Sequence, residues 1–348
     1  MLYVPVISSN GQPLMPCHPA RARELVRNGR AVRRFDRGLF SLRLVNRQDG
    51  AVQPLAVGID PGSKKEGFTV KSAAHTFLNL QADAVTWVKD AVTTRREMRR
   101  GRRFRKTPCR APRQNRARGG LPPSTRARWQ WKLRLARWLA RMYPVARFVV
   151  EDIKARTRGT RRWDASFSPL ESGKQWFYQE LTTVAPVETK QGWETKELRD
   201  GLGLKMSRDK LAEVFGSHCI DSWVLANWWT GGHTQPDYTR LLCVTPFRFH
   251  RRQLHRLQPE PGGIRKPYGG TRSHGFKRGS LVTHPRWGLA YVGGCVGDRI
   301  SLHSVTSGAR LTQGAKPSEC RFLTFNSWRT RLLPGLKAGV SAARAAVL

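Results

Sequence analysis

Short apolar runs between turn residues predict a sheet near the middle of the chain. PLAVGIDPG at 54–62, GFTVKS at 67–72 and HTFLNLQADAVTW at 75–87 predict two or three adjacent strands, the first ending on Asp60. A later run at 148–150 ends on Glu151 and Asp152, so a second strand delivers acid to the edge of a sheet. The pattern therefore predicts an α/β fold whose sheet gathers carboxylates.

Helical periodicity is clearest at residues 126–144, where apolar side chains share one face and basic side chains lie elsewhere. The apolar face consists of Trp131, Leu135, Trp138, Leu139 and Met142. The basic positions are Lys132, Arg134, Arg137 and Arg141. We expect the tryptophans to be core residues and the basic side chains to lie away from that core. Residues 171–184 predict another helix, followed by a short strand at 185–189.

A third acidic position lies in SHCIDSWVLANWW, residues 217–229. His218, Asp221 and Leu225 stand at i, i+3 and i+7, so the imidazole and the carboxylate are expected on one helical face. Apolar neighbours give this helix a side that can pack on the sheet. Taken alone, a His-x-x-Asp pair is common by chance and indicates a capping or surface pair.

Both ends of the chain predict smaller units. Residues 1–52 combine a strand-like start, a short helix at 20–27 closed near Gly29, and a hairpin-like pair of strands. After Trp229, a Gly-Gly pair and Pro236 mark a boundary. Residues 233–348 are basic and rich in Gly and Pro, then alternate short strands with Gly turns, which predicts a small β-rich domain.

Composition adds a strong positive charge to this picture. The 348 residues include 63 Lys and Arg against 24 Asp and Glu, a formal net charge of +39. Such a charge destabilises a compact chain by self-repulsion unless a polyanion neutralises it, so nucleic acid is the expected partner. There is no long apolar run and no C-x-x-C pair among the six cysteines, so we expect no membrane association and a cytoplasmic, nucleoid-associated protein.

The charge is concentrated at residues 95–118, where twelve of 24 residues are Arg or Lys. The first half can be helical, whereas Pro108 and Pro112 interrupt the second half. Because this long run is inserted between two strands, it predicts binding to a nucleic-acid backbone. The contact residues expected in it are Arg95, Arg96, Arg99, Arg100, Arg102, Arg103, Arg105, Lys106, Arg110 and Arg113. Lys64 and Lys65, in a turn of small residues, suit a phosphate backbone that passes close by.

The candidate catalytic residues are Asp60, Glu151, His218 and Asp221, because two strand ends and one helix can bring them to a single edge of the sheet. Carboxylate oxygens suit two Mg²⁺ ions about 3.5–4 Å apart, which clamp the attacking and leaving oxygens of a phosphodiester. Mn²⁺ is the expected substitute. His218 would orient or deprotonate the attacking water or bind a metal ion, and the sequence leaves these roles open.

The motifs IDPGSKKEG, VVEDI and His-x-x-Asp resemble the three motifs of a split RuvC-type nuclease with an RNase H fold. The Arg-rich insert resembles the bridge helix of CRISPR type II effectors. Residues 12–32 resemble the PLMP domain of IscB-type, transposon-encoded RNA-guided nucleases. Residues 251–258, GGIRKPYGGT and HGFKRGSLV resemble the domain with which these proteins contact the target-adjacent motif. The resemblance spans nearly the whole chain, in the family's order.

IscB proteins carry an HNH nuclease domain between the second and third RuvC motifs. Here only about one helix, one strand and loops are expected between Glu151 and His218, so the chain is similar to IsrB, the relative without HNH. The resemblance implies an omega-RNA guide, target double-stranded DNA with a short adjacent motif, and a nick in the displaced non-target strand. It also implies a monomeric protein in a ribonucleoprotein complex. The candidates for reading the adjacent motif are Arg265, Lys266, Arg272 and Lys277.

This interpretation divides the chain into five segments. They are a PLMP-like domain at 1–52, a first RuvC segment at 53–89, the Arg-rich bridge helix and linker at 90–125, the second and third RuvC segments at 126–232, and the β-rich motif-interacting domain at 233–348.

Two alternative functions stay open. A guide-independent RuvC-like nuclease, such as a junction resolvase or transposase, leaves the Arg-rich insert unexplained. A non-catalytic RNA-binding protein is opposed by the presence of all four catalytic-type residues.

Overall fold

The computed structural model describes residues 3–104, 121–152, 171, 173–247, 259–260, 263–264 and 272–333. The chain forms two compact units. The first takes in residues 1–32, 43–243 and 332–348, and the second takes in residues 33–42 and 244–331. The described residues contain six α-helices, all in the first unit: α1 (Pro19–Arg27), α2 (Trp87–Phe104), α3 (Pro123–Met142), α4 (Lys174–Thr182), α5 (Gly192–Gly201) and α6 (Cys219–Thr230).

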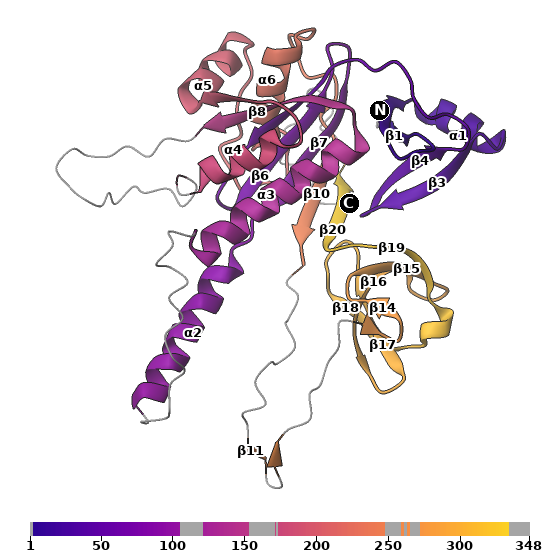
Figure 1. Ribbon diagram of the computed structural model, residues 1–348, viewed down its shortest axis with the longest axis vertical. Helices are drawn as coiled ribbons and strands as arrows, with labels where there is room; N and C mark the ends of the chain where they lie inside the picture. The colour runs from indigo at the N-terminus through magenta and orange to yellow at the C-terminus, as the bar shows by residue number, and fades with distance from the viewer. Residues whose placement is uncertain are drawn as a thin grey trace. The chain divides into compact units, whose positions relative to one another are not determined.

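The largest sheet has seven strands, and most of their residues belong to the first unit (Figure 1). Its strands are β5 (Leu55–Asp60), β6 (Lys65–Lys71), β7 (Thr76–Asp83), β8 (Val145–Asp152), β9 (Val187–Gln191), β10 (Leu241–Pro246) and β20 (Trp328–Leu333). Their order is β20-β10-β7-β6-β5-β8-β9. β5, β6 and β7 are antiparallel neighbours, whereas β8 pairs parallel with β5 and β9 pairs parallel with β8. Three antiparallel strands beside two parallel ones, in this order, form an RNase H-like sheet, which confirms the expected fold class.

The strand β10 follows the Gly-Gly pair at 231–232 and lies in the large sheet. The residues after 233 were expected in a separate C-terminal domain, yet β10 joins the large sheet next to β7. The reason lies in the Gly-Gly pair: Gly231 and Gly232 have φ values of +67° and +93°. Gly231 directly follows α6, so the left-handed pair ends a helix and lets the chain return to the sheet.

Helices cover both faces of the sheet. On β6, Gly67 faces α6, because a Cβ at this position would stand 2.2 Å from the carbonyl oxygen of His218. The preceding residue, Glu66, pairs instead with Lys132 of α3, with 2.7 Å between Oε1 and Nζ. Successive residues of a strand point to opposite faces, so these two contacts assign α6 and α3 to opposite sides of the sheet. All six residues of β5 are buried between them.

The helix α6 is buried almost all round, from Cys219 to Asn227. A helix without a solvated stripe belongs in an interior, and α6 lies between the sheet and α5. The polar groups beneath it are satisfied, since the hydroxyl of Thr69 lies 2.9 Å from that of Ser222 and 3.0 Å from Oδ1 of Asn79. The expected single apolar side is therefore too narrow a description of this helix.

The helix α3 confirms the expected core face but not the expected basic face. Trp131, Trp138 and Leu139 are buried as predicted. Lys132, expected outside the core, is fully buried and forms the ion pair with Glu66. Helical spacing alone could not reveal this, because the buried partner lies on a strand 66 residues away in sequence.

The N-terminal elements follow the sequence prediction. β1 (Val4–Ile7), β2 (Pro13–Cys17), β3 (Ala31–Asp36) and β4 (Leu39–Leu44) form a four-stranded sheet in the order β2-β1-β4-β3. The helix α1 begins after His18, whose Nδ1 accepts a hydrogen bond from the Ala20 amide (3.2 Å). It closes at Gly29, where φ is +67°, as the sequence indicated.

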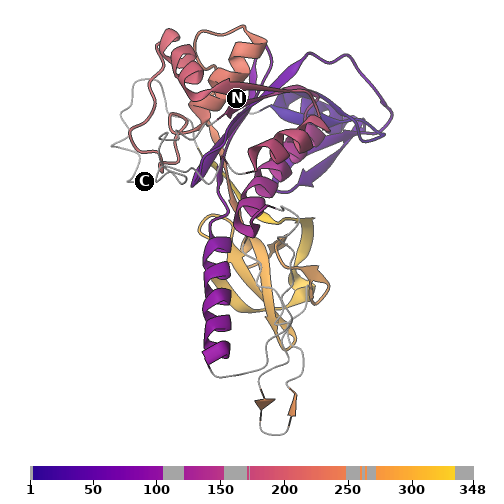
Figure 2. The ribbon, with the colours of Figure 1, turned by 60° about the vertical axis from the view of Figure 1, so that its left-hand side comes forward.

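The helix α2 carries the first part of the Arg-rich segment. It packs against α3 and extends beyond the sheet in both views (Figures 1 and 2). The helix reaches Phe104, which confirms that the first half of the segment is helical. The second half, with Pro108 and Pro112, lies outside the described residues.

The second unit is β-rich, as expected. Its five-stranded antiparallel sheet has the order β18-β17-β16-β15-β19 and a core that includes Val282, Val292 and Leu302. The strands are β15 (Ser280–His284), β16 (Gly288–Val296), β17 (Arg299–Ser304), β18 (Arg310–Ala315) and β19 (Arg321–Phe325), with two-residue ladders in β11 (Pro259–Glu260), β12 (Gly263–Ile264), β13 (Arg272–Ser273) and β14 (Phe276–Lys277). Across the described residues, no helix is long and apolar enough to span a bilayer. Cys17, Cys219, Cys295 and Cys320 form no disulfide within the described part of the chain.

We expect Gly58→Ala to lower the free energy of unfolding by at least about 1–3 kcal/mol, since overpacking moves backbone. A Cβ at Gly58 would stand 1.8 Å from the carbonyl oxygen of Ser222 and 2.9 Å from the amide nitrogen of Ala226, so α6 would have to move. Urea unfolding of the full chain measures the change. Gly201→Ala is the matched control, because nothing lies within 4 Å of its Cβ. Equal stability of the two variants would contradict the close packing.

Candidate active site

Strand register brings Asp60 and Glu151 together. In the parallel pair β5–β8, Ile59 stands opposite Val150, so the next residue of each strand lies on the same face at the same edge. The two carboxyl groups are within hydrogen-bonding distance of each other, and both residues are largely removed from solvent. The sequence prediction that two strand ends deliver acid to one edge is confirmed for these two positions.

His218 reaches the same edge from the start of α6. Its Nδ1 lies 2.7 Å from Oδ2 of Asp60, and its Nε2 lies 3.0 Å from the carbonyl oxygen of Lys210. Both ring nitrogens face acceptors, which favours the doubly protonated ring. Burial acts to lower the pKa of His218, but the hydrogen bond and the charge of Asp60 outweigh it and raise this pKa above its ordinary value.

The expected pairing of His218 with Asp221 on one helical face is wrong. His218 precedes α6, with φ −130° and ψ −28°, so the spacing of side chains along a helix does not apply to it. Its ring contacts Asp60, whereas Asp221, in the first turn, pairs with Arg199 of α5. The two residues still share a site, because Asp60 lies close enough to act electrostatically on both.

Burial and repulsion between carboxylates raise the pKa values of Glu151 and Asp221. Burial, then the charge and hydrogen bond of Asp60, then the charge of Asp221, raise the pKa of Glu151 to about 9. Burial and the charge of Asp60 raise the pKa of Asp221 to about 6, against the lowering effect of Arg199. Such a cluster holds a proton at neutral pH, and a bound cation can take the place of that proton.

Arg199 is a cation of this centre that the sequence analysis missed. Its NH1 lies 2.5 Å from Oδ1 of Asp221, and the side chains are 12% and 5% exposed. The residue lies on α5, a helix that was not expected between Glu151 and His218. A sequence signal for α5 exists: Gln191 and Glu194 form a capping box, in which the Glu194 carboxylate accepts a hydrogen bond from the Gln191 amide (2.6 Å).

A second missed feature holds the loop that follows Asp60. Lys132 of α3 donates from Nζ to Oε1 of Glu66 (2.7 Å) and to the carbonyl oxygen of Gly62 (3.3 Å). One turn earlier on α3, Arg128 donates to the carbonyl oxygen of Ser63 (3.3 Å). Burial raises the pKa of Glu66 in spite of the Lys132 charge. The loop is therefore held from the face of the sheet opposite α6.

The donor chemistry of the site fits a divalent metal ion such as Mg²⁺, because carboxylate oxygens are the ligands this ion prefers. Asp60, Glu151 and Asp221 would supply these oxygens, and His218 a nitrogen. Within the described ranges, however, no three His, Cys, Asp or Glu side chains are already placed to hold one ion. Asp60 is bonded to His218 and Asp221 to Arg199, so binding of a cation requires these contacts to open.

The expected nucleic-acid contacts fall into four groups. Exposed and available side chains are Lys64, Arg95, Arg96, Arg99, Arg100, Arg272 and Lys277. Lys65 is instead engaged in ion pairs with Asp83 (2.6 Å) and Glu213 (3.4 Å). Arg102 and Arg103 lie on α2, and their side chains are outside the described part of the chain. Outside it altogether are Arg105, Lys106, Arg110, Arg113, Arg265 and Lys266.

On α2 the four described arginines stand at i, i+1, i+4 and i+5, so they form one exposed stripe. In the second unit, Arg272 and Lys277 are opposite each other in the β13–β14 hairpin. The Lys277 ammonium lies 5.1 Å from the centre of the Phe325 ring. Both groups present cations to solvent, which is what a phosphate backbone or a base edge requires.

A protein-family model described as "RRXRR protein" matches residues 4–165. The matched range includes Arg99-Arg100-Gly101-Arg102-Arg103 on α2. Among solved structures, the chain is similar to RuvC of T. thermophilus in complex with a Holliday junction substrate. The two are 12% identical over 52% of this chain and 98% of that chain, with a TM-score of 0.28, a likeness too distant to add to the topology. No curated protein matches the sequence.

We expect Lys132→Met to destabilise the protein by about 3–5 kcal/mol, because it leaves Glu66 charged, buried and without its partner. The double variant Lys132→Met, Glu66→Gln removes both charges and should recover most of this loss. Chemical unfolding of the two variants and the parent chain measures the difference. A single variant as stable as the parent would contradict the buried ion pair.

We expect Arg199→Gln to lower the melting temperature in the absence of divalent metal, because Asp221 loses its cation. Added Mg²⁺ should then raise the melting temperature more than it does in the parent chain, since the ion replaces the missing charge. Lys196→Gln is the matched control on the same helix, where an exposed pair with Asp200 (3.1 Å) is lost. An identical response to Mg²⁺ in Arg199→Gln and the parent would refute this role.

Proposed function

We propose that this protein is an RNA-guided DNA endonuclease that cleaves a phosphodiester with Asp60, Glu151, His218 and Asp221. The observation that carries the proposal is the meeting of these four side chains, from β5, β8 and the start of α6, at one edge of an RNase H-like sheet. The four residues are far apart in sequence, and we take their meeting in the fold as support for a shared role. The match to the RRXRR family, which is found in IscB- and IsrB-like nucleases, supports the same activity.

In this proposal the carboxylates hold metal ions in position next to the substrate phosphate. When bound, Mg²⁺ ions would stabilise charge on the phosphoryl oxygens and make a bound water a stronger nucleophile. Asp60 lies between Glu151 and His218, so it connects the two halves of the site. Once its contact with Asp60 opens, His218 can orient a water or remove its proton, because its other nitrogen stays bonded to the Lys210 carbonyl.

The guide and target would be held mainly through their backbones. The arginine stripe of α2 presents closely spaced guanidinium groups, which suit a salt-sensitive contact that does not depend on base sequence. In this scheme an omega RNA supplies the sequence specificity by pairing with the target strand. Arg272 and Lys277 of the second unit are candidates for reading a short motif beside the target.

We infer that the product is a nick in the displaced strand. A single group of catalytic-type carboxylates supports one cut, and between Glu151 and His218 the described residues contain only α4, β9 and α5. A two-strand break would need a second nuclease centre or a second binding event. The reaction is therefore expected to convert supercoiled plasmid into open circles.

The test uses the full chain, co-purified with its RNA, with Mg²⁺ and a supercoiled plasmid that matches the guide. We expect guide-dependent open circles. Asp60→Asn and Glu151→Gln should each slow nicking by at least about 10–100-fold, the loss that follows even from removing an outer partner of a metal ligand. Chelation of the metal should stop it, and Mn²⁺ should restore it.

Asp200→Asn is the matched control, because this carboxylate lies on α5 but is half exposed and pairs with Lys196. It should nick at the parent rate. Guide-independent nicking would favour a junction-resolving or transposase-like enzyme. Equal nicking by the parent and Asp60→Asn would refute the assignment of the site, and linear product from the purified complex would refute the single cut.

A further inference from the structure

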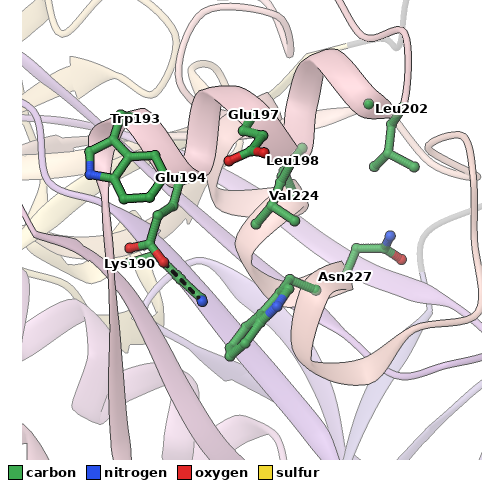
Figure 3. A pocket seen from close by; sticks show the side chains of 10 residues that line it. Lys190, Trp193, Glu194, Glu197, Leu198, Leu202, Val224 and Asn227 are labelled. Carbon is green, nitrogen blue, oxygen red and sulfur yellow. Dashed lines mark hydrogen bonds and ion pairs between the residues drawn. The ribbon is translucent and has the colours of Figure 1, made fainter.

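A cavity of about 480 Å³ lies beside the candidate active site, between β9, α5 and α6 (Figure 3). Figure 3 shows Trp193, Glu194, Glu197 and Leu198 along α5, with Asn227 on α6. A volume of this size suits a small ligand or one unit of a polymer. The nuclease assignment does not use any of these side chains.

Two tryptophan rings give the cavity its apolar surface. Trp193 is 67% exposed and Trp228 is 39% exposed, and they are the two exposed tryptophans among the described residues. The Lys190 ammonium lies 4.1 Å from the centre of the Trp228 ring and 3.1 Å from Oε1 of Glu194. Solvent-exposed indole faces with a cation close by are the surface on which a flat aromatic ligand stacks.

Asn227 and Glu197 contribute hydrogen-bond acceptors to the lining of the cavity. Asn227 is 8% exposed and donates from Nδ2 to the His233 carbonyl (2.8 Å), which defines the orientation of its amide. Its Oδ1 is buried and accepts no hydrogen bond within the described part of the chain. Glu197 adds an exposed carboxylate. A ligand that fills this cavity should therefore bring hydrogen-bond donors and an apolar face.

The cavity and the carboxylates are built on neighbouring positions of the same sheet and on the same helix, α6. Lys190 stands opposite Glu151 in the parallel pair β8–β9, so both side chains lie on the α6 face. On α6, Trp228 follows Asp221 by seven residues, about 10 Å along the helix axis. A single strand with one phosphate at the carboxylates can thus place a neighbouring base at the tryptophans.

We propose that this cavity binds one unpaired nucleobase of the DNA strand that is cut. The proposal rests on the proposed nuclease function and names how that site holds its substrate. Phosphate is a poor occupant, because the cation of the cavity, Lys190, is already paired with Glu194 and the Glu197 carboxylate repels an anion. A base offers a stacking face to Trp193 and Trp228, and its amino group can donate to the exposed carboxylate of Glu197. An unpaired base is required, because the faces of a base inside a duplex are already stacked on the neighbouring bases.

The experiment measures base binding without cleavage. Full-length protein with its RNA, in chelator, is titrated with single-stranded DNA that carries the fluorescent base 2-aminopurine at successive positions around the cut site. Stacking on indole should quench the fluorescence at one position. Replacing that base by an abasic residue, with all phosphates kept, should weaken binding about tenfold or more.

Trp193→Ala is the decisive variant, because the side chain is mostly exposed and its loss should leave the fold intact. It should remove most of the quenching and the preference over the abasic strand, while Trp193→Phe should keep both. Phe35→Ala, which removes an exposed aromatic from β3, should behave like the parent.

The outcomes separate the two proposals. Position-specific quenching without any nicking would retain the base site and refute the nuclease. Guide-dependent nicking with equal binding of intact and abasic strands, and no effect of Trp193→Ala, would refute the base site and favour a protein segment as its occupant.

Discussion

The close packing of α6 against β5 and β6 is the constraint on which the rest of the site depends. Glycine at 58 and 67 removes the side chains that would hold the helix away, so backbone of α6 touches backbone of the sheet. This approach brings His218 to Asp60 and sets Asp221 close by. It also places α6 against α5, which supplies Arg199 and one wall of the cavity lined by Trp193 and Trp228. Two absent Cβ atoms thus determine the geometry of a site to which neither glycine contributes a side chain.

The site reverses the charge balance of the chain. A protein with a formal charge of +39 concentrates buried carboxylates at one edge of its sheet and assigns internal cations to most of them. Asp60 has His218, Asp221 has Arg199 and Glu66 has Lys132. Among the described residues, Glu151 has no ion pair of its own, and its pKa is raised to about 9, against about 6 for Asp221. Local compensation lets the protein fold around these acids while the basic surface remains available for nucleic acid.

The sequence predicted the elements whose signal is local. Apolar runs that end on Asp60 and Glu151 located two strands of the site, and helical periodicity located the buried tryptophans of α3. It failed where the deciding contact is distant in sequence. Lys132 looked like a surface cation because Glu66 lies on another element, and His218 looked helical because its backbone angles cannot be read from spacing. Arg199 was missed because α5 has little apolar periodicity, although its capping box was readable.

The hydrogen bonds from α3 to the loop after Asp60 have a thermodynamic consequence. Arg128 and Lys132 hold the carbonyl groups of Ser63 and Gly62, and the same helix packs against α2 with its arginine stripe. Any polyanion that shifts α3 on binding α2 must either carry this loop with it or leave a buried carboxylate without its cation. If such a shift occurs, binding at the basic helix and binding at the carboxylates are coupled, and the coupling is reciprocal. A ligand at the carboxylates would then alter the affinity for nucleic acid by the same factor as nucleic acid alters the affinity for that ligand.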